Sequence, residues 1–304
     1  MAVWRLQSKT SAGHIGQYCR DHRVLAMGWS LQELEPSQRE AITTYDQYIH
    51  YAKEHHPSSP GVKQLLQLRP GDFVWMRHQG RYYMGHVTES SHWFFNSSEE
   101  AKQLDAANQL TDIEWVEYEQ ADESTVPGAI STAFIRGHTL QRIKKAGVEE
   151  FSKLVYNHEK GQQVYHVNLE QTEETFYELL SPSDCEDLLA MWLYQKYQYI
   201  CIPSTNKRAT QLYECVLINP ADGEHIYIQV KKGNVNINAE DYADLKGQVW
   251  FLTTSGQVEH ASRFPNMHVV EPSELYNFAV ENQNTHLLPP SIQAWFRLLR
   301  EQKL

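Results

Sequence analysis

Four polar side chains in the second half of the chain have the types and the spacing that a metal-dependent hydrolytic site would use. In the segment HIYIQVKK, side chains alternate between the two faces of a predicted strand, so Gln229 and Lys231 share one face. Glu214 lies among apolar residues in the preceding segment LYECVLIN, and the turn NPADGEH between the two segments predicts a hairpin. Glu186 lies near the start of a predicted helix. If the hairpin forms, these side chains can face a common site.

Hydrolysis of a phosphodiester bond is the chemistry that this combination would serve. Such hydrolysis uses a divalent cation, Mg²⁺ or Mn²⁺, which oxygen ligands hold and which polarises the phosphoryl oxygen. Glu214 offers a carboxylate oxygen and Gln229 a neutral carbonyl oxygen, and Glu186 can complete the ligand shell or hold a metal-bound water. Lys231 can orient the attacking water, help to deprotonate it and stabilise the developing negative charge.

Ordinary structural roles are the alternative for each of these residues. A Gln and a Lys two positions apart on a strand are also common on a solvated sheet face. Glu214 can be a charge that protects an edge strand from aggregation. Glu186 and its neighbour Asp187 can favour a helix N-terminus electrostatically.

The elements that must position these residues follow a helix–strands–helix order. The segment SPSDCEDLLAMWLYQKY predicts a helix with Ser183 or Asp184 as its N-cap and one apolar stripe. The stripe consists of Leu188, Leu189, Trp192 and Leu193. Strand-like segments follow, and SIQAWFRLLREQKL predicts a final helix. This order predicts an α/β mixed sheet flanked by helices over residues 165–304.

The first half of the chain is rich in short strand-like segments. Turn residues separate β-branched and aromatic runs such as VWRLQ, DFVWMRHQ, RYYMGHVT and IEWVEYE, and HQGR predicts the reversal of a hairpin. Helical spacing occurs in SQREAITTYDQYIHYAKEH and PGVKQLLQL. We therefore predict a small curved or closed sheet with helices at its ends over residues 1–150. The whole chain is predicted to be a two-domain α+β protein.

Composition narrows the class of protein. A chain of 304 residues with a net charge of −11 disfavours broad, nonspecific nucleic-acid binding and leaves room for a local basic groove. The four cysteines form no CxxC pair, and Cys201 and Cys215 are expected to be small buried strand residues. No apolar run approaches the roughly 20 residues that span a bilayer, so we expect no membrane partner and a cytoplasmic location.

The C-terminal motifs resemble a nuclease family. The helix with CEDLLAMWL, the strand with YECVLI and the strand IYIQVKKG resemble, in this order, the PD-(D/E)XK superfamily, and most closely its Mrr-like restriction endonuclease branch. The resemblance implies that Glu186 is the helix acid, Glu214 the metal-binding acid, Gln229 the second strand ligand and Lys231 the catalytic lysine. Glu214 stands where most members have Asp, and Gln229 removes one negative charge. An inactive descendant is therefore the alternative.

The N-terminal half resembles domains of the EVE or PUA-like class over most of residues 1–145, through VWRLQ, MGWSL, LRPGDFVWMRHQGRYYMGHV and VPGAISTAFIRGHTLQRI. This resemblance implies a β-barrel-like fold that binds nucleic acid or holds a flipped, modified base in an aromatic pocket. The candidate pocket walls are Trp29, Trp75, Trp93 and Phe94, and the candidate polar readers are Arg77, Arg81 and His78. Core packing is the alternative for these aromatics, and we expect one or two of the four to face a ligand.

Together the two resemblances imply a modification-dependent DNA endonuclease that uses Mg²⁺ or Mn²⁺ and protects a bacterial cell against phage or foreign DNA. A homodimer is expected, because one nuclease site cuts only one strand at a time. The alternative is a nuclease-like protein without activity that binds nucleic acid as a sensor or serves as a partner subunit. RNA is a third candidate target, since PUA-like domains also meet RNA.

Overall fold

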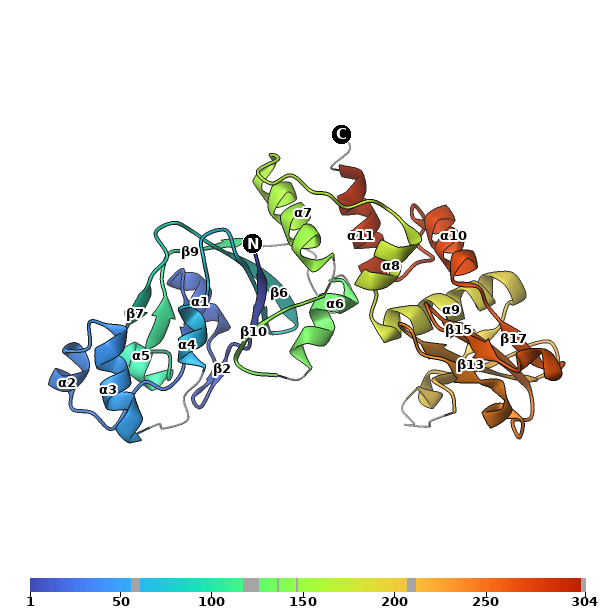
Figure 1. Cartoon of the computed structure of the whole chain (residues 1–304), viewed down its shortest axis with the longest axis horizontal. Coiled ribbons are helices and arrows are strands. Elements are labelled where there is room, and N and C mark those ends of the chain that lie inside the picture. The colour runs from blue at the N-terminus through green and yellow to red at the C-terminus, as the bar shows by residue number, and fades with distance from the viewer. Residues whose placement is uncertain (56–60, 117–125, 136, 146, 207–211, 302–304) are drawn as a thin grey trace. The chain divides into compact units, whose positions relative to one another are not determined.

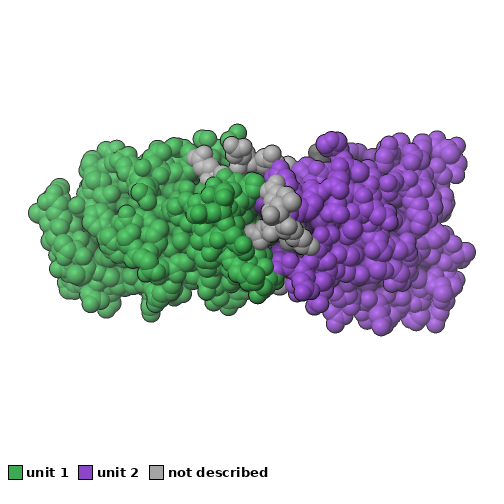
Figure 2. Space-filling view, turned by 90° about the horizontal axis from the view of Figure 1, so that it is seen from above, with its two compact units in different colours: residues 1–126, 130–168 green, residues 127–129, 169–304 purple. Residues whose placement is uncertain are grey.

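A computed structural model of the chain describes residues 1–55, 61–116, 126–135, 137–145, 147–206 and 212–301. The chain divides into two compact units (Figure 2). Unit 1 comprises residues 1–126 and 130–168, and unit 2 comprises residues 127–129 and 169–304. The predicted limit at residue 150 therefore falls inside a helix of unit 1. The described helices include none that is long and apolar enough to cross a membrane.

Unit 1 is built mainly from strands. These are β1 (Val3–Leu6), β2 (Lys9–Thr10), β3 (Gly13–His14), β4 (Leu25–Met27), β5 (Phe73–His78), β6 (Arg81–Val87), β7 (Trp93–Phe95), β8 (Asn108–Leu110), β9 (Ile113–Val116) and β10 (Leu140–Arg142). The α-helices are α1 (Gly16–Asp21), α2 (Pro36–Glu40), α3 (Tyr45–His55), α4 (Val62–Leu65), α5 (Glu99–Gln103) and α7 (Val148–Lys160). The short helix α6 (Gly128–Ser131) begins in unit 2 and ends in unit 1, where the 3₁₀ turn Thr132–Phe134 follows it.

The prediction of a β-barrel in unit 1 is wrong for the described residues. The strands form a five-stranded sheet in the order β10-β1-β5-β6-β9, a three-stranded sheet in the order β4-β8-β7 and the small pair β2-β3. The consecutive strands β8 and β9 belong to different sheets, and Asp112 between them has a φ of +51°. The two larger sheets instead contribute to one shared apolar core, which includes Val74 of β5 and Leu25 of β4.

Alternation along β5 explains how this sheet is covered on both sides. Val74 and Met76 enter the core shared with the second sheet. Phe73 and Trp75 point the other way, toward α7, where the Trp75 ring stacks on Phe151 at 6.3 Å. The predicted hairpin is confirmed, because β5 and β6 pair antiparallel around a two-residue turn in which both φ angles are positive.

Unit 2 is a mixed sheet between two layers. Its helices are α8 (Glu173–Leu179), α9 (Pro182–Tyr197), α10 (Pro272–Asn282) and α11 (Pro290–Glu301). Its strands are β11 (Ile200–Cys201), β12 (Cys215–Ile218), β13 (His225–Lys231), β14 (Ile237–Asn238), β15 (Gln248–Thr253), β16 (Val258–Glu259) and β17 (Met267–Val269). The 3₁₀ turns are Pro203–Thr205, Ala239–Tyr242 and Ala261–Arg263.

The main sheet of unit 2 has the order β11-β12-β13-β15-β17. β11, β12 and β13 are antiparallel neighbours, whereas β15 and β17 run parallel to β13. Residues from all four helices pack into the apolar core on one face (Figure 1). A smaller core on the other face includes Ile237, Tyr242 and Phe251. The predicted α/β mixed sheet with flanking helices is therefore present in its coarse form.

Helix α9 begins at a well-defined N-terminus. The Ser181 side chain accepts a hydrogen bond from the Asp184 N–H, and the Asp184 carboxylate accepts one from the Ser181 N–H, which is a capping box. Ser181 is the N-cap, two residues before the predicted Ser183 and three before the predicted Asp184. Gly128 leaves no room beside this cap, because a Cβ there would lie 2.2 Å from the Ser181 Cβ and from an Asp184 carboxylate oxygen.

Candidate active site

The β12–β13 hairpin brings three of the four predicted side chains together. Cys215 pairs with Ile228, and the Glu214 N–H donates a hydrogen bond to the Ile228 carbonyl at 2.9 Å. This register places Glu214 beside the polar face of β13. The Lys231 Nζ donates a hydrogen bond to the Glu214 Oε1 at 3.3 Å, so the lysine faces the carboxylate. The predicted hairpin is confirmed.

Gln229 is the unusual residue of this face. Its side chain is 1% exposed, and neither its Oε1 nor its Nε2 has a hydrogen-bond partner among the described residues. A buried amide without partners costs about 1–3 kcal/mol, so natural proteins rarely retain one that has no use. An amide oxygen is a suitable ligand for a hard cation. This orphaned oxygen is the observation that fits Mg²⁺ or Mn²⁺ to the site.

Glu186 lies in the first turns of α9, and the charges of Glu214 and Lys231 on the hairpin affect its ionisation. Burial raises the pKa of Glu186, the charges of Glu214 and Asp187 raise it further, and Lys231 partly opposes them. The result is a pKa of about 7. Two carboxylates that repel each other in a partly buried place are stabilised when a cation enters between them.

The candidate metal ligands carry little negative charge. No group of three or more His, Cys, Asp and Glu side chains able to hold a metal ion occurs in the described part of the chain. A cation at this site would therefore be held by Glu186, Glu214 and the neutral oxygen of Gln229, with water in the remaining positions. Mg²⁺ commonly keeps several water ligands, so this small set is compatible with it.

The aromatic candidates of unit 1 do not converge on one place. Trp75 is fully buried, and its indole N–H donates a hydrogen bond to Ser152 at 2.9 Å, so Trp75 is a core residue and no pocket wall. Trp93 is half-buried against Tyr45 and Tyr48. Phe94, its neighbour on β7, is 46% exposed.

The polar candidates lie around the β5–β6 turn. Arg77 and Arg81 are exposed, and Arg77 lines a pocket of about 230 Å³ with His14, Gln79 and others. His78 alternates to the opposite side and is buried. Burial, followed by the charges of Arg20 and His14, lowers the pKa of His78, which favours its neutral form.

Trp29 is the aromatic candidate that lines a cavity. The pocket has a volume of about 380 Å³ and includes Lys9, Gln32 and Asp105 in its lining. Trp29 adopts a left-handed backbone conformation with φ of +57°, and Asp105 one with φ of +48°. Both are rare for residues other than glycine, and such strain is concentrated at functional sites.

Asp105 shapes this pocket, although it was not among the residues predicted from the sequence. Its carboxylate accepts hydrogen bonds from the Ser30 N–H at 3.1 Å and from the Ser11 hydroxyl at 2.8 Å. Gly28 allows this approach, because a Cβ there would lie 2.7 Å from an Asp105 carboxylate oxygen. The dipeptide Gly28-Trp29 was a possible signal, whereas the partner from residue 105 is brought in only by the fold.

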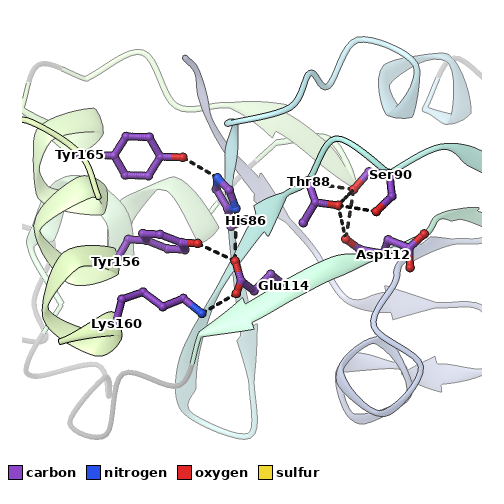
Figure 3. Close-up of polar contacts among 9 residues, drawn as sticks. His86, Thr88, Ser90, Asp112, Glu114, Tyr156, Lys160 and Tyr165 are labelled. Atoms are coloured by element: carbon purple, nitrogen blue, oxygen red, sulfur yellow. Dashed lines mark hydrogen bonds and ion pairs between the residues drawn. The ribbon is translucent and has the colours of Figure 1, made fainter. Parts of the chain in front are cut away.

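A second polar cluster of unit 1 was also missed. Figure 3 shows His86 of β6, Glu114 of β9 and Tyr156 and Lys160 of α7 pointing toward one another, with Tyr165 beside them. Tyr156 donates a hydrogen bond to Glu114 at 2.6 Å, Lys160 also donates to Glu114, and His86 Nε2 lies 2.6 Å from the Tyr165 hydroxyl. Because these groups form hydrogen bonds with one another, we interpret the cluster as a structural contact that holds α7 against the sheet.

Comparison with known proteins gave no match to a protein-family model, a curated protein or a solved structure.

Proposed function

We propose that this protein is a divalent-metal-dependent endonuclease that cuts DNA carrying a modified base. The observation that carries the proposal is the buried, unpartnered amide of Gln229 on the same strand face as the Lys231–Glu214 pair. The order of α9 and strands β11, β12 and β13 supports it, since it agrees with the nuclease resemblance of the sequence. The raised pKa of Glu186 supports it further, because catalytic carboxyl groups often have perturbed pKa values.

The chain's own groups have distinct roles in this proposal. Glu186, Glu214 and Gln229 would hold Mg²⁺ or Mn²⁺, whose chemistry is to polarise the scissile phosphate and to acidify a bound water. The Lys231 ammonium would orient the attacking water and stabilise the negative charge that develops on the phosphate. Because the Lys231 Nζ already lies 3.3 Å from Glu214, its position is set by the carboxylate before the substrate arrives.

Unit 1 supplies the recognition of the modified base in this proposal. The pocket beside Trp29 is of suitable volume for one base, and stacking on an aromatic ring contributes about 1–3 kcal/mol per base. The Asp105 carboxylate can accept a hydrogen bond from an exocyclic amino group. Two copies of the chain would be needed to cut both strands, so the active form is proposed to be a homodimer, at least transiently.

The experiment is cleavage of matched plasmid DNAs that contain cytosine, 5-methylcytosine or 5-hydroxymethylcytosine, with Mg²⁺, Mn²⁺ or EDTA. The wild-type protein should cut a modified DNA only with a divalent cation. Lys231→Ala should lower the rate by at least about a hundredfold, because it removes the charge that stabilises the transition state. Lys246→Ala is the matched control, because Lys246 is an exposed lysine of the same unit. If wild type and Lys231→Ala cut all DNAs equally poorly, the nuclease proposal is wrong.

The second candidate is a nucleic-acid-binding protein without nuclease activity. The observation that favours it is the limited charge of the donor set, since Gln229 is neutral and the described residues include no three-residue cluster of His, Cys, Asp and Glu able to hold a metal. Tight DNA binding in EDTA, with no cleavage in Mg²⁺ or Mn²⁺, would support this candidate. Competition between matched RNA and DNA ligands would identify the preferred nucleic acid.

A further inference from the structure

Cys201 and Cys215 place two thiols side by side in unit 2. Cys201 is directly opposite Leu217 on the neighbouring strand, so it lies on the same sheet face as Cys215, two residues before Leu217. The Cys201 Sγ lies 3.9 Å from the Cys215 Sγ, within hydrogen-bond distance for sulfur. Both were predicted to be small buried residues of strands, which is confirmed for Cys215 and wrong for the burial of Cys201, whose side chain is partly exposed.

The two thiols differ in their access to solvent. Cys201 is partly exposed, whereas Cys215 is only 4% exposed. The other two cysteines, Cys19 and Cys185, are fully buried in the apolar cores of units 1 and 2. A soluble reagent can therefore reach Cys201 first. Cys215 is the thiol that lies next to Cys201 within the protein.

The hydrogen bond between the two sulfurs favours the reactive form of Cys201. When Cys215 is the donor, its S–H stabilises a Cys201 thiolate, which lowers the pKa of Cys201 and raises that of Cys215. Burial raises the pKa of Cys19 and of Cys185 to about 12, so both stay protonated at neutral pH. Since the thiolate is the nucleophile, the four cysteines fall into one reactive pair and two inert residues.

We propose that Cys201 and Cys215 form a reversible redox site that hydroperoxides oxidise to an intramolecular disulfide. The Cys201 thiolate attacks one peroxide oxygen, the O–O bond breaks, and the other oxygen leaves as water or an alcohol after taking up a proton. Cys201 is thereby oxidised to a sulfenic acid while the peroxide is reduced. The Cys215 sulfur then attacks the Cys201 sulfur, the S–S bond forms, the S–O bond breaks, and water leaves with the thiol proton.

Oxidation would shift the two sulfur atoms from 3.9 Å to about 2.05 Å apart. Cys215 directly follows Glu214, so the shift would occur next to the candidate active site. The inference itself does not depend on the proposed nuclease activity.

The test treats the full-length native protein with hydrogen peroxide, labels the remaining thiols with N-ethylmaleimide and maps the peptides by mass spectrometry. We expect a linkage between Cys201 and Cys215 that dithiothreitol reverses, while Cys19 and Cys185 keep free thiols. In Cys215→Ser, which cannot form the disulfide, a sulfenic acid at Cys201 should persist and react with dimedone. In Cys201→Ser, Cys215 should stay reduced.

Because the wild-type protein carries the main measurement, the test does not depend on how well either variant folds. Native protein that consumes peroxide without forming the Cys201–Cys215 linkage would overturn the inference. Alkylation of Cys201 no faster than that of Cys19 and Cys185 would overturn it as well, since the proposed site requires an accessible thiolate.

Discussion

Gln229 illustrates how much one residue can indicate about a site. Its amide is buried on a strand whose other polar residue, Lys231, is paired with Glu214, and it has no hydrogen-bond partner among the described residues. A residue kept for stability would be expected to have its hydrogen bonds satisfied. We therefore propose that Gln229 serves a ligand and that its buried amide costs stability when that ligand is absent.

Replacing Gln229 should separate stability from cation binding. We expect Gln229→Leu to leave the unfolding free energy of the metal-free protein unchanged or to raise it by about 1 kcal/mol, because an unsatisfied amide is removed. The same substitution should weaken Mn²⁺ binding by at least about tenfold, measured by titration calorimetry.

Gln248→Leu is the matched control on the neighbouring strand β15. The Gln248 amide donates a hydrogen bond to Glu224 at 2.8 Å, so its loss should lower stability and leave Mn²⁺ binding unchanged. Unchanged Mn²⁺ binding in Gln229→Leu, together with a clear loss of stability, would show that Gln229 is a structural residue.

At the scale of elements, hydrogen bonds and ion pairs between ionisable side chains hold α7 against its sheet. Burial lowers the pKa of His86, although the neighbouring Glu114 carboxylate opposes this. Burial alone would raise the pKa of Glu114, but hydrogen bonds from Lys160 and Tyr156 outweigh it, so the pKa of Glu114 is lowered. The fold therefore favours a neutral histidine and an ionised carboxylate.

Because the pKa values of His86 and Glu114 are both lowered, unit 1 becomes less stable as the pH falls. For His86 the stabilisation is present above its ordinary pKa of 6.5 and is lost as the pH falls below that value. For Glu114 it is lost as the pH falls below its ordinary value of 4.5. We expect the midpoint temperature of thermal unfolding of unit 1 to decrease when the pH is lowered from 7 to 5. This decrease should be smaller in His86→Gln. The exposed His50 is the control, and a His50→Gln profile as flat as that of His86→Gln would contradict the assignment.

Elements whose signals are local were predicted well from the sequence. The alternation in HIYIQVKK, the NPADGEH turn and the stripe of α9 depend on neighbouring residues, and the structure contains the hairpin and the helix. The prediction of a barrel was wrong because closure depends on which strands pair at a distance, and the consecutive strands β8 and β9 belong to different sheets. Trp75 was misassigned because its type suits a pocket and a core equally, and only α7 decides between them.

At the scale of the whole molecule, the proposal assigns recognition to one unit and cleavage to the other. The pocket beside Trp29 belongs to unit 1, and the Lys231–Glu214 pair belongs to unit 2. If the two tasks are separate, a substitution in one unit should alter one task and spare the other.

Trp29→Ala tests this separation. We expect it to reduce the preference for modified over plain DNA by about tenfold, since one stacked base contributes about 1–3 kcal/mol. The cleavage rate on plain DNA should stay at the wild-type level. Phe94→Ala removes an exposed aromatic residue of the same unit that does not line the pocket, and it should change neither quantity. An equal loss of preference in both variants would mean that the pocket beside Trp29 is not the reader.

The position of Gly128 restricts how such a protein can be reassembled by recombination. Residues 127–129 belong to unit 2, although residues 1–126 and 130–168 on either side belong to unit 1. A genetic crossover that exchanged the N-terminal unit as one continuous block would therefore also replace the segment that packs against the start of α9. A side chain at position 128 would collide with Ser181 and Asp184, so the N-terminal cap of α9 would have to shift. An N-terminal unit exchanged in this way would therefore have to keep that glycine.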